Sequence, residues 1–219
     1  MARKGIKIYA DDGRLSFDVK SVNDKYITLI TKCDGDLKEC KGINIPDSSF
    51  GKEELTQKDK YFLDFCCHHK IDFVGISFVD KADYLKKIQS YIGGRHPKAV
   101  AKIENSSAIS NLSEILDISY AIMIDRGDLF AEVGIAEFYE AILKISETSL
   151  SCKRPLIMAK ENLDSMQHRL QPSKSEVISL QHSINLGSNL VMLSDETATS
   201  DLYMNTIKWL HEFLQLQRR

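Results

Sequence analysis

The stretch AVAKIEN, residues 99–105, begins like a buried strand, with small and apolar side chains, and then places a lysine and a glutamate two positions apart. Side chains alternate across a β-strand, so Lys102 and Glu104 share one face while Ile103 points the other way into packing. In folds built on parallel strands, functional groups lie where the strands end at their carboxyl edge. We therefore expect these two charges to belong to a site.

Four more apolar runs of strand length accompany this stretch. In chain order the five runs are IDFVGISF, KAVAKIEN, YAIMIDRGD, RPLIMAKEN and SNLVMLSDET, each followed by a polar loop and then a helical pattern. Helical spacing is explicit in residues 81–92 and again in residues 203–216. The apolar stripe of the second helix consists of Met204, Ile207, Leu210 and Leu214. Five successive βα units predict a parallel sheet covered by helices, either doubly wound or part of a (β/α)8 barrel.

The first 45 residues have a different pattern. IKIYADDGRLSFDVKSV places a DDG turn between two alternating arms, and KYITLITKC is a β-branched run. These features predict a small antiparallel sheet that packs separately from the parallel one. The period changes at KGINIP, so we expect an all-β segment over residues 1–45 and the barrel portion over residues 46–219.

The composition favours a globular, cytoplasmic protein. The chain has 219 residues, of which 43% are hydrophobic and 27% charged, and a formal net charge of −2. Dispersed lysines and arginines argue against nucleic-acid binding, and the apolar runs are too short to span a bilayer. The N-terminus lacks the apolar core of a signal peptide. Five cysteines, an odd number without zinc or redox spacing, are expected to be reduced thiols with a structural role.

Two carboxylates stand out as metal candidates. Glu104 and Asp128 follow neighbouring predicted strands, which lie roughly 4.8 Å apart in a sheet, so both can reach one small hard cation such as Mg²⁺ or Mn²⁺. The alternative is that they are solvated loop charges in surface salt bridges. The RGD tripeptide at residues 126–128 also matches a cell-adhesion motif, which the missing secretion signal disfavours.

The motifs together resemble the pyruvate kinase family. AKIEN, IMIDRGDL, NLDSM and VMLSDETA occur in this order, and ADDGRLSFDV, KGINIP and LTQKDK…IDFVGISFV precede them, so the match covers nearly the whole chain. The resemblance implies a (β/α)8 TIM barrel with a small all-β lid inserted after its third strand. It also implies the glycolytic transfer of a phosphoryl group from phosphoenolpyruvate to ADP, with Mg²⁺ or Mn²⁺ and usually K⁺.

The resemblance implies roles for the charged residues. Lys102 is similar to the family lysine that neutralises the phosphoryl group in flight and the enolate. Glu104 and Asp128 match the two Mg²⁺ carboxylates.

The resemblance also implies binding roles for four other residues. The backbone of Arg126 and Gly127 matches a turn that holds the substrate carboxylate on N–H groups. Ser77 matches a pocket serine, and Lys41 matches a lysine that contacts nucleotide phosphate where the lid rejoins the barrel.

Part of the family's fold has no counterpart here. Relative to the family, we expect the chain to begin inside the lid and to lack the first three barrel strands, with the arginine, asparagine and aspartate that they contribute to the phosphate and K⁺ sites. We likewise expect no counterpart of the C-terminal regulatory domain. Five strands cannot close an eight-stranded barrel, so we expect a homo-oligomer or a companion chain to cover the open edge.

Other departures cluster at the pocket. Lys160 replaces the family's proton-donating threonine and Glu161 replaces a glutamine. Asp125 stands where a small residue is usual, and Asp195 where glycine or alanine is usual. Each of these changes adds charge. A carboxylate at Asp125, beside a carboxylate-binding turn, should repel the family's substrate.

Three functions remain open at this point. The first is a divergent or truncated pyruvate kinase homologue with an incomplete site, inactive by itself or working as a binding or scaffold paralogue. The second is an enzyme completed by a companion chain. The third is a barrel enzyme in which Lys160, with its pKa lowered by Lys102, forms a Schiff base with a carbonyl substrate. A plainer expectation pairs Lys160 with Glu161, Asp164 or Asp195.

Overall fold

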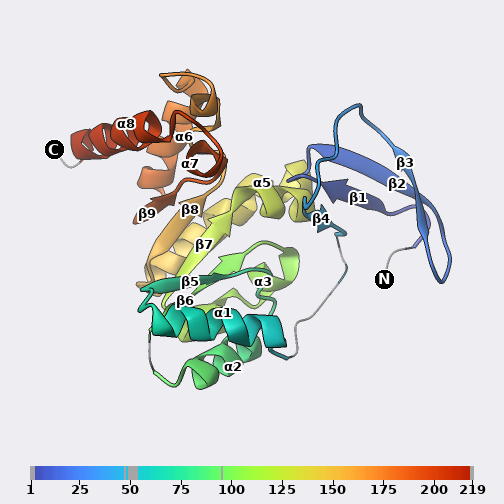
Figure 1. The fold of residues 1–219 in the computed structure, drawn as a ribbon, viewed down its shortest axis with the longest axis horizontal. Helices are drawn as coiled ribbons and strands as arrows, with labels where there is room; N and C mark the ends of the chain where they lie inside the picture. The colour runs from blue at the N-terminus through green and yellow to red at the C-terminus, as the bar shows by residue number, and fades with distance from the viewer. Residues whose placement is uncertain (1–2, 47, 49–53, 95, 218–219) are drawn as a thin grey trace.

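The computed structural model describes residues 3–46, 48, 54–94 and 96–217. Two separate sheets organise this part of the chain, a small antiparallel one near the N-terminus and a parallel one in the centre (Figure 1). Among the described residues, no helix is long and apolar enough to cross a membrane. All five cysteines are free thiols, as expected.

The antiparallel sheet has the strand order β3-β2-β1-β4. Its strands are β1 (Lys7–Ala10), β2 (Leu15–Val22), β3 (Ile27–Thr31) and β4 (Ile43–Asn44). The DDG turn joins β1 to β2, and left-handed backbone at Asp11, Asp12 and Gly13 lets the chain reverse there. The sheet therefore forms where the alternating pattern predicted it, while the division into two domains at residue 45 stays a prediction.

The parallel sheet has the strand order β5-β6-β7-β8-β9 and curls as half of a barrel does. Its strands are β5 (Phe73–Ile76), β6 (Lys98–Ile103), β7 (Ala121–Asp125), β8 (Leu156–Ala159) and β9 (Leu190–Met192). Each strand pairs only with its neighbours in the chain, which right-handed βα crossovers produce. All five apolar runs form strands of this sheet.

Helices connect the strands. They are α1 (Gln57–His68), α2 (Ala82–Ile92), α3 (Ser106–Ser110), α4 (Leu112–Ile118), α5 (Arg126–Ser151), the 3₁₀ helix η1 (Asp164–Gln167), α6 (Lys174–Asn185), α7 (Asp195–Ala198) and α8 (Tyr203–Leu216). Thr56 and Ser173 begin α1 and α6 with capping boxes, in which the side chain accepts from the third helical N–H. A left-handed backbone at Gly134 kinks α5.

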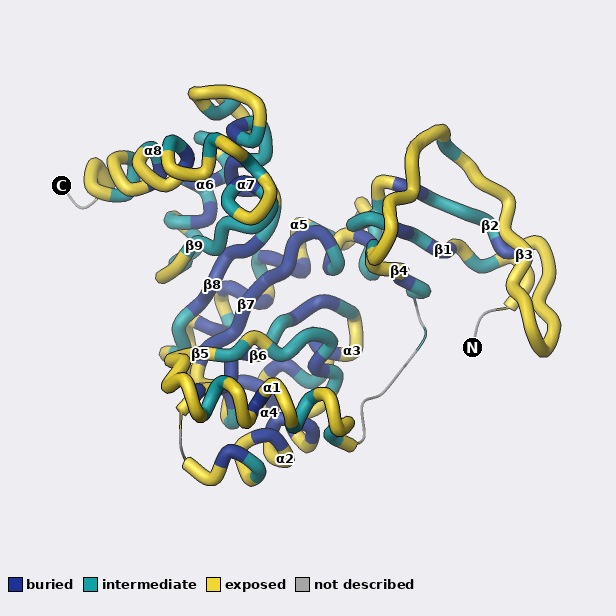
Figure 2. Tube along the Cα trace, viewed as in Figure 1, coloured by how far each residue is buried: buried dark blue, intermediate teal, exposed yellow. Residues whose placement is uncertain are grey.

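The main core lies between the parallel sheet and the helices on its outer face. Alternate strand residues, including Ile103, Ile124 and Met158, pack there against α2, α4 and α5. The residues between them, such as Val100 and Met123, form a smaller cluster on the inner face. Figure 2 shows the buried segment running along β6, β7 and β8. Ile103 thus points away from the face of Lys102 and Glu104, as the alternation predicted.

The predicted apolar stripe of α8 is wrong in part. Leu210 is buried with Leu163, Met166 and Leu180, and Leu214 packs beside them, but Met204 and Ile207 are 50% and 44% exposed. The reason is that α8 packs mainly against η1 and α7, and among the described residues only Val191 of β9 joins the same apolar cluster from the sheet. Contact along a narrow line buries Thr206 and Leu210 and leaves Met204 and Ile207 largely in solvent.

Candidate active site

The candidate site lies at the carboxyl edge of β5, β6 and β7. Lys102 is the fifth residue of β6, Glu104 directly follows that strand, and Asp125 ends β7. Asp128 lies in the first turn of α5, which begins without a break after β7. Parallel pairing in register brings these strand ends together, so residues 21 or more positions apart in the chain meet at one edge.

Lys102 is held by acidic and hydroxyl groups from all three strands. Its Nζ lies 2.5 Å from Oε1 of Glu104 and 2.9 Å from Oδ2 of Asp125. It also donates a hydrogen bond of 3.1 Å to Oγ of Ser77. Burial lowers the pKa of Lys102, but the two negative charges more than offset this, so its pKa lies above the ordinary value. The ammonium is therefore charged and fixed in direction.

Glu104 is fully buried, and its second oxygen accepts a 2.5 Å hydrogen bond from the backbone N–H of Phe78. That N–H is directed at the carboxylate by a left-handed backbone at Phe78. Burial raises the pKa of Glu104 to about 7, against the opposing effect of Lys102. This environment therefore disfavours the ionised form of Glu104 unless a further cation binds.

Asp128 connects the site to the antiparallel sheet. The amide of Asn44, on β4, donates to Oδ1 of Asp128 at 3.1 Å and to Glu132 at 3.2 Å. Burial raises the pKa of Asp128 above its ordinary value, and the Asn44 amide opposes this. Sequence reasoning did not single out Asn44, although it lies within the KGINIP motif.

The predicted metal ligands do come together. Glu104, Asp125 and Asp128 each offer a carboxylate oxygen, and these oxygens lie within 4.8 Å of one another. An oxygen-only donor set with a compact arrangement is what Mg²⁺ and Mn²⁺ prefer. The residues present therefore fit a divalent cation. Asp125 is an unpredicted member of this group, because the sequence pattern indicated only that its charge would oppose a substrate carboxylate.

Arg126 and Gly127 occupy the start of α5 but differ in what surrounds them. The Arg126 guanidinium is buried and donates to the carbonyl oxygens of Ala159 and Lys160. It also reaches the side chains of Asn162 and Ser179 at 2.7 and 2.8 Å. Because Arg126 and Gly127 are both buried, the RGD sequence cannot serve as an adhesion motif.

Gly127 is fixed by the antiparallel sheet. A Cβ atom at Gly127 would lie 2.9 Å from both Cβ and Cγ of Asp12, closer than side-chain atoms approach. Only glycine allows the turn between β1 and β2 to lie directly against the start of α5. The carboxylate of Asp12 thus covers the turn that the resemblance connects with a substrate carboxylate.

Two expectations about Lys160 are wrong. It pairs with Asp12 at 3.2 Å, and not with Glu161, Asp164 or Asp195. Burial lowers the pKa of Lys160, but the charge and hydrogen bond of Asp12, together with the charges of Asp125 and Asp195, more than offset this, so the pKa lies above its ordinary value and is not lowered. A lysine in this state is a poor Schiff-base nucleophile, and this argues against the third function.

Further charges join the two sheets. Arg14 lies 3.5 Å from Asp164 of η1, while Lys41 pairs with Asp11 at 2.8 Å within the N-terminal segment. Burial, together with the nearby charge of Glu196, raises the pKa of Asp164 to about 6. The DDG turn is therefore held to the barrel portion by charged contacts on both of its sides.

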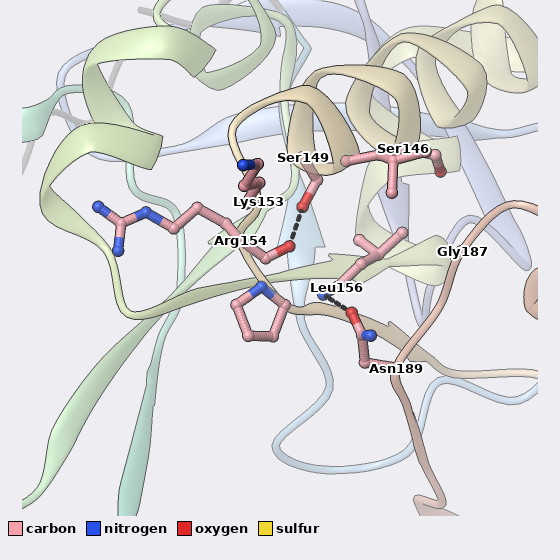
Figure 3. Close-up of a pocket in the computed structure, with 9 residues that line it drawn as sticks. Ser146, Ser149, Lys153, Arg154, Leu156, Gly187 and Asn189 are labelled. Carbon is pink, nitrogen blue, oxygen red and sulfur yellow. Dashed lines mark hydrogen bonds between the residues drawn. The ribbon is translucent and has the colours of Figure 1, made fainter.

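The cavities in the structure do not indicate a different location for the candidate site. One of about 290 Å³ lies at the opposite edge of the sheet, between the end of α5 and the start of β8. There Ser149 donates to the carbonyl of Arg154 and Asn189 accepts from the N–H of Leu156, while the Arg154 side chain points away (Figure 3). A smaller cavity of about 140 Å³, lined in part by Phe78 and Glu132, lies beside the carboxylate cluster.

The fold and the site define the class: a βα-barrel type of protein that gathers a lysine and three carboxylates at the carboxyl edge of its parallel strands. A family model described as "Pyruvate kinase, barrel domain" matches residues 1–207. The chain belongs to the pyruvate kinase family. This confirms the predicted fold class, a partial TIM barrel of pyruvate kinase type with a β segment of the lid.

Curated pyruvate kinases are similar to almost the whole chain. The pyruvate kinase of Hypocrea jecorina is 33% identical over 211 residues, 95% of this chain and 39% of the relative. Those of Borreliella burgdorferi and Geobacillus stearothermophilus are each 32% identical, over 94% and 95% of this chain and 44% and 36% of their own lengths. The chain thus spans about two fifths of the length of these relatives.

Proposed function

We propose that this chain carries part of a pyruvate kinase-type site for phosphoryl transfer from phosphoenolpyruvate to ADP, incomplete without further groups. The observation that carries the proposal is Lys102 between Glu104 and Asp125, with Asp128 beside them, at the carboxyl edge of the sheet. Phosphoryl transfer is catalysed mainly by positioning and by cations around the developing charge. A fixed ammonium next to a divalent-cation site provides the elements of that environment.

In this proposal, Lys102 stabilises negative charge on the reacting groups, and Ser77 orients its ammonium. Glu104 and Asp128 hold Mg²⁺ or Mn²⁺, which when bound would neutralise charge on phosphate oxygens. The N–H groups at Arg126 and Gly127, at the start of α5, bind the carboxylate of the substrate. Lys41 binds a nucleotide phosphate after leaving Asp11. K⁺ is implied by the family, although the strands that supply most of its ligands are not matched.

The chain by itself is proposed to be inactive or very weak. Lys102 already has two carboxylate partners, and Lys160, in place of a hydroxyl proton donor, is paired with Asp12. Either arrangement opposes the binding of an anionic substrate in the same space. Such a chain can also work as a non-catalytic binding or scaffold paralogue, and its location in the cytoplasm stays a prediction.

A second candidate is an enzyme completed by a companion chain. The observation that favours it is apolar exposure at both edge strands: Phe73 on β5 is 47% exposed and Leu190 on β9 is 52% exposed. Edge strands with apolar side chains are natural places for another chain to pair. A homo-oligomer would cover the same edges, and the lid segment over residues 1–45 would keep its own fold in either assembly.

Calorimetric titration with phosphoenolpyruvate at saturating Mg²⁺ tests the proposed site. We expect weak binding to the purified chain, and loss of that binding in Lys102→Met with no loss of Mg²⁺ binding. The exposed Lys86, which pairs with Asp83 on the surface, provides the matched control Lys86→Met. Equal binding of phosphoenolpyruvate to all three proteins would reject a phosphoryl-type site at Lys102.

A further inference from the structure

Asp125 is the group in the site whose role neither the sequence nor the family explains. We propose that Asp125 is a third carboxylate ligand for the divalent cation, so that this chain binds Mg²⁺ or Mn²⁺ by its own residues without an anionic substrate. The inference rests on the proposed function for the location of the cation. It adds Asp125 to the ligands of the cation. It also implies that the site favours the binding of a cation and disfavours the binding of an anion.

The three carboxylates lie close enough together to bind one ion. Their nearest ligand oxygens lie within 4.8 Å of one another. Oxygens bound to Mg²⁺ at 2.0–2.1 Å lie about 3 Å apart when adjacent and about 4 Å apart when opposite. Only a small inward movement is therefore needed for Glu104, Asp125 and Asp128 to share one ion.

Asp125 has a buried oxygen that is placed to bind a cation. Asp125 is 1% exposed, and one of its oxygens, Oδ2, contacts Lys102. The other, Oδ1, is buried and has no hydrogen-bond partner among the described residues. A buried carboxylate oxygen without a donor is costly, and a bound cation would remove that cost.

The three carboxylates together have more negative charge than Lys102 neutralises. Three carboxylates, at Glu104, Asp125 and Asp128, face one ammonium, at Lys102, which gives 3 − 1 = 2 negative charges in excess. Apart from Lys102, the groups that donate to Asp128 and Glu104 are a neutral amide, of Asn44, and a backbone N–H, of Phe78. A divalent cation neutralises the excess, because its two positive charges equal the two negative ones.

The same carboxylate explains a weak affinity for anions. With Asp125 in place, a bound cation has one more negative ligand and Lys102 has a second counter-charge. Both effects reduce the positive potential that a phosphate or carboxylate would meet. Cation affinity and anion affinity at this site should therefore change in opposite directions when Asp125 is neutralised.

Titration with Mn²⁺ alone, followed by electron paramagnetic resonance of the free ion, tests the inference on the full chain. We expect wild type to bind one Mn²⁺ and Asp125→Asn to bind it at least about tenfold more weakly, since ligand charge sets affinity at such sites. Glu132→Gln, a neighbouring acid outside the cluster, is the matched control and should change affinity by less than about threefold. Thermal unfolding in chelator establishes that each variant is folded.

The outcomes separate this inference from the proposed function. If Asp125→Asn binds Mn²⁺ as wild type does while Glu104→Gln and Asp128→Asn do not, the inference is wrong and the two-carboxylate site stands. If wild type binds no Mn²⁺, the metal site fails in both proposals, and a higher unfolding temperature of Asp125→Asn in chelator would then show that Asp125 only adds charge repulsion to the cluster.

Discussion

Glu104 is fully buried, and the pKa of its carboxyl depends on its burial and on the charged residues beside it. Lys102 stabilises the charged form, while burial and the neighbouring Asp128 oppose it. The net result is a pKa of about 7, well above the ordinary value of 4.5 for a glutamate carboxyl. A site that raises a carboxyl pKa in this way keeps it neutral below pH 7 unless a cation binds.

In chelator, the pH dependence of stability should change in Glu104→Gln. Between pH 4.5 and 7 the folded chain holds this proton and the unfolded chain does not, so the free energy of unfolding falls as pH rises. The fall is on the order of 3 kcal/mol for Glu104 alone. Urea unfolding at several pH values should give a flatter profile for Glu104→Gln than for wild type.

Asp164, with a pKa of about 6, contributes to the same pH range, so Asp164→Asn is the matched comparison. It should remove its own part of the slope and leave that of Glu104. Identical profiles for wild type and Glu104→Gln would contradict the assignment of a raised pKa to Glu104.

Gly127 allows a second test with single residues. Gly127→Ala places a methyl group 2.9 Å from the side chain of Asp12, which forces the DDG turn away from α5. We expect the variant to lose about 1–3 kcal/mol of stability, measured by urea unfolding. Adding Asp12→Gly, at a backbone position that is left-handed already, should recover part of the loss. A loss that is unchanged in the double variant would mean that the strain lies elsewhere.

At the scale of elements, strands were more predictable than helix faces. An apolar run such as AVAKIEN is specified locally, since any strand buried on both faces must be apolar along its length. The face of α8 is specified by its neighbours, so the stripe of Met204 and Ile207 was correctly periodic and still largely exposed. Lys160 shows the same limit: its partner, Asp12, lies 148 residues away, and local spacing contains no information about such a contact.

Arg126 joins elements that are far apart in the chain. From the start of α5, its guanidinium holds the loop after β8 and reaches Ser179 on α6. Arg126→Lys keeps the charge but loses the planar set of donors, so several buried acceptors lose their partners. We expect a loss of about 3 kcal/mol or more in urea unfolding. The matched control is Arg154→Lys, whose side chain makes one hydrogen bond, to the carbonyl of Asp117, and should cost less than about 1 kcal/mol.

For the molecule as a whole, the two sheets meet through charges at the site itself. Asp12 with Lys160, Arg14 with Asp164, and Asn44 with Asp128 join the antiparallel sheet to the barrel portion. None of these contacts is a large apolar interface, so the N-terminal sheet and the site are coupled through polar groups. A change at Lys160 therefore affects both the chemistry of the pocket and the attachment of the sheet that covers it.

The whole chain is expected not to make ATP from phosphoenolpyruvate and ADP at a rate that matters. Loss of one cationic group from a phosphoryl-transfer site can cost orders of magnitude in rate, and here Lys102 is already paired with two carboxylates and Lys160 with Asp12. Lys160→Thr combined with Asp125→Ala should release Asp12, remove the carboxylate beside Lys102 and so improve phosphoenolpyruvate binding at saturating Mg²⁺, without restoring turnover. Calorimetry measures the binding, and a lactate dehydrogenase-coupled assay measures the turnover. Turnover by the purified chain near ordinary enzyme rates, roughly 1 to 1,000 per second, would contradict this prediction and favour an enzyme assembled from several copies.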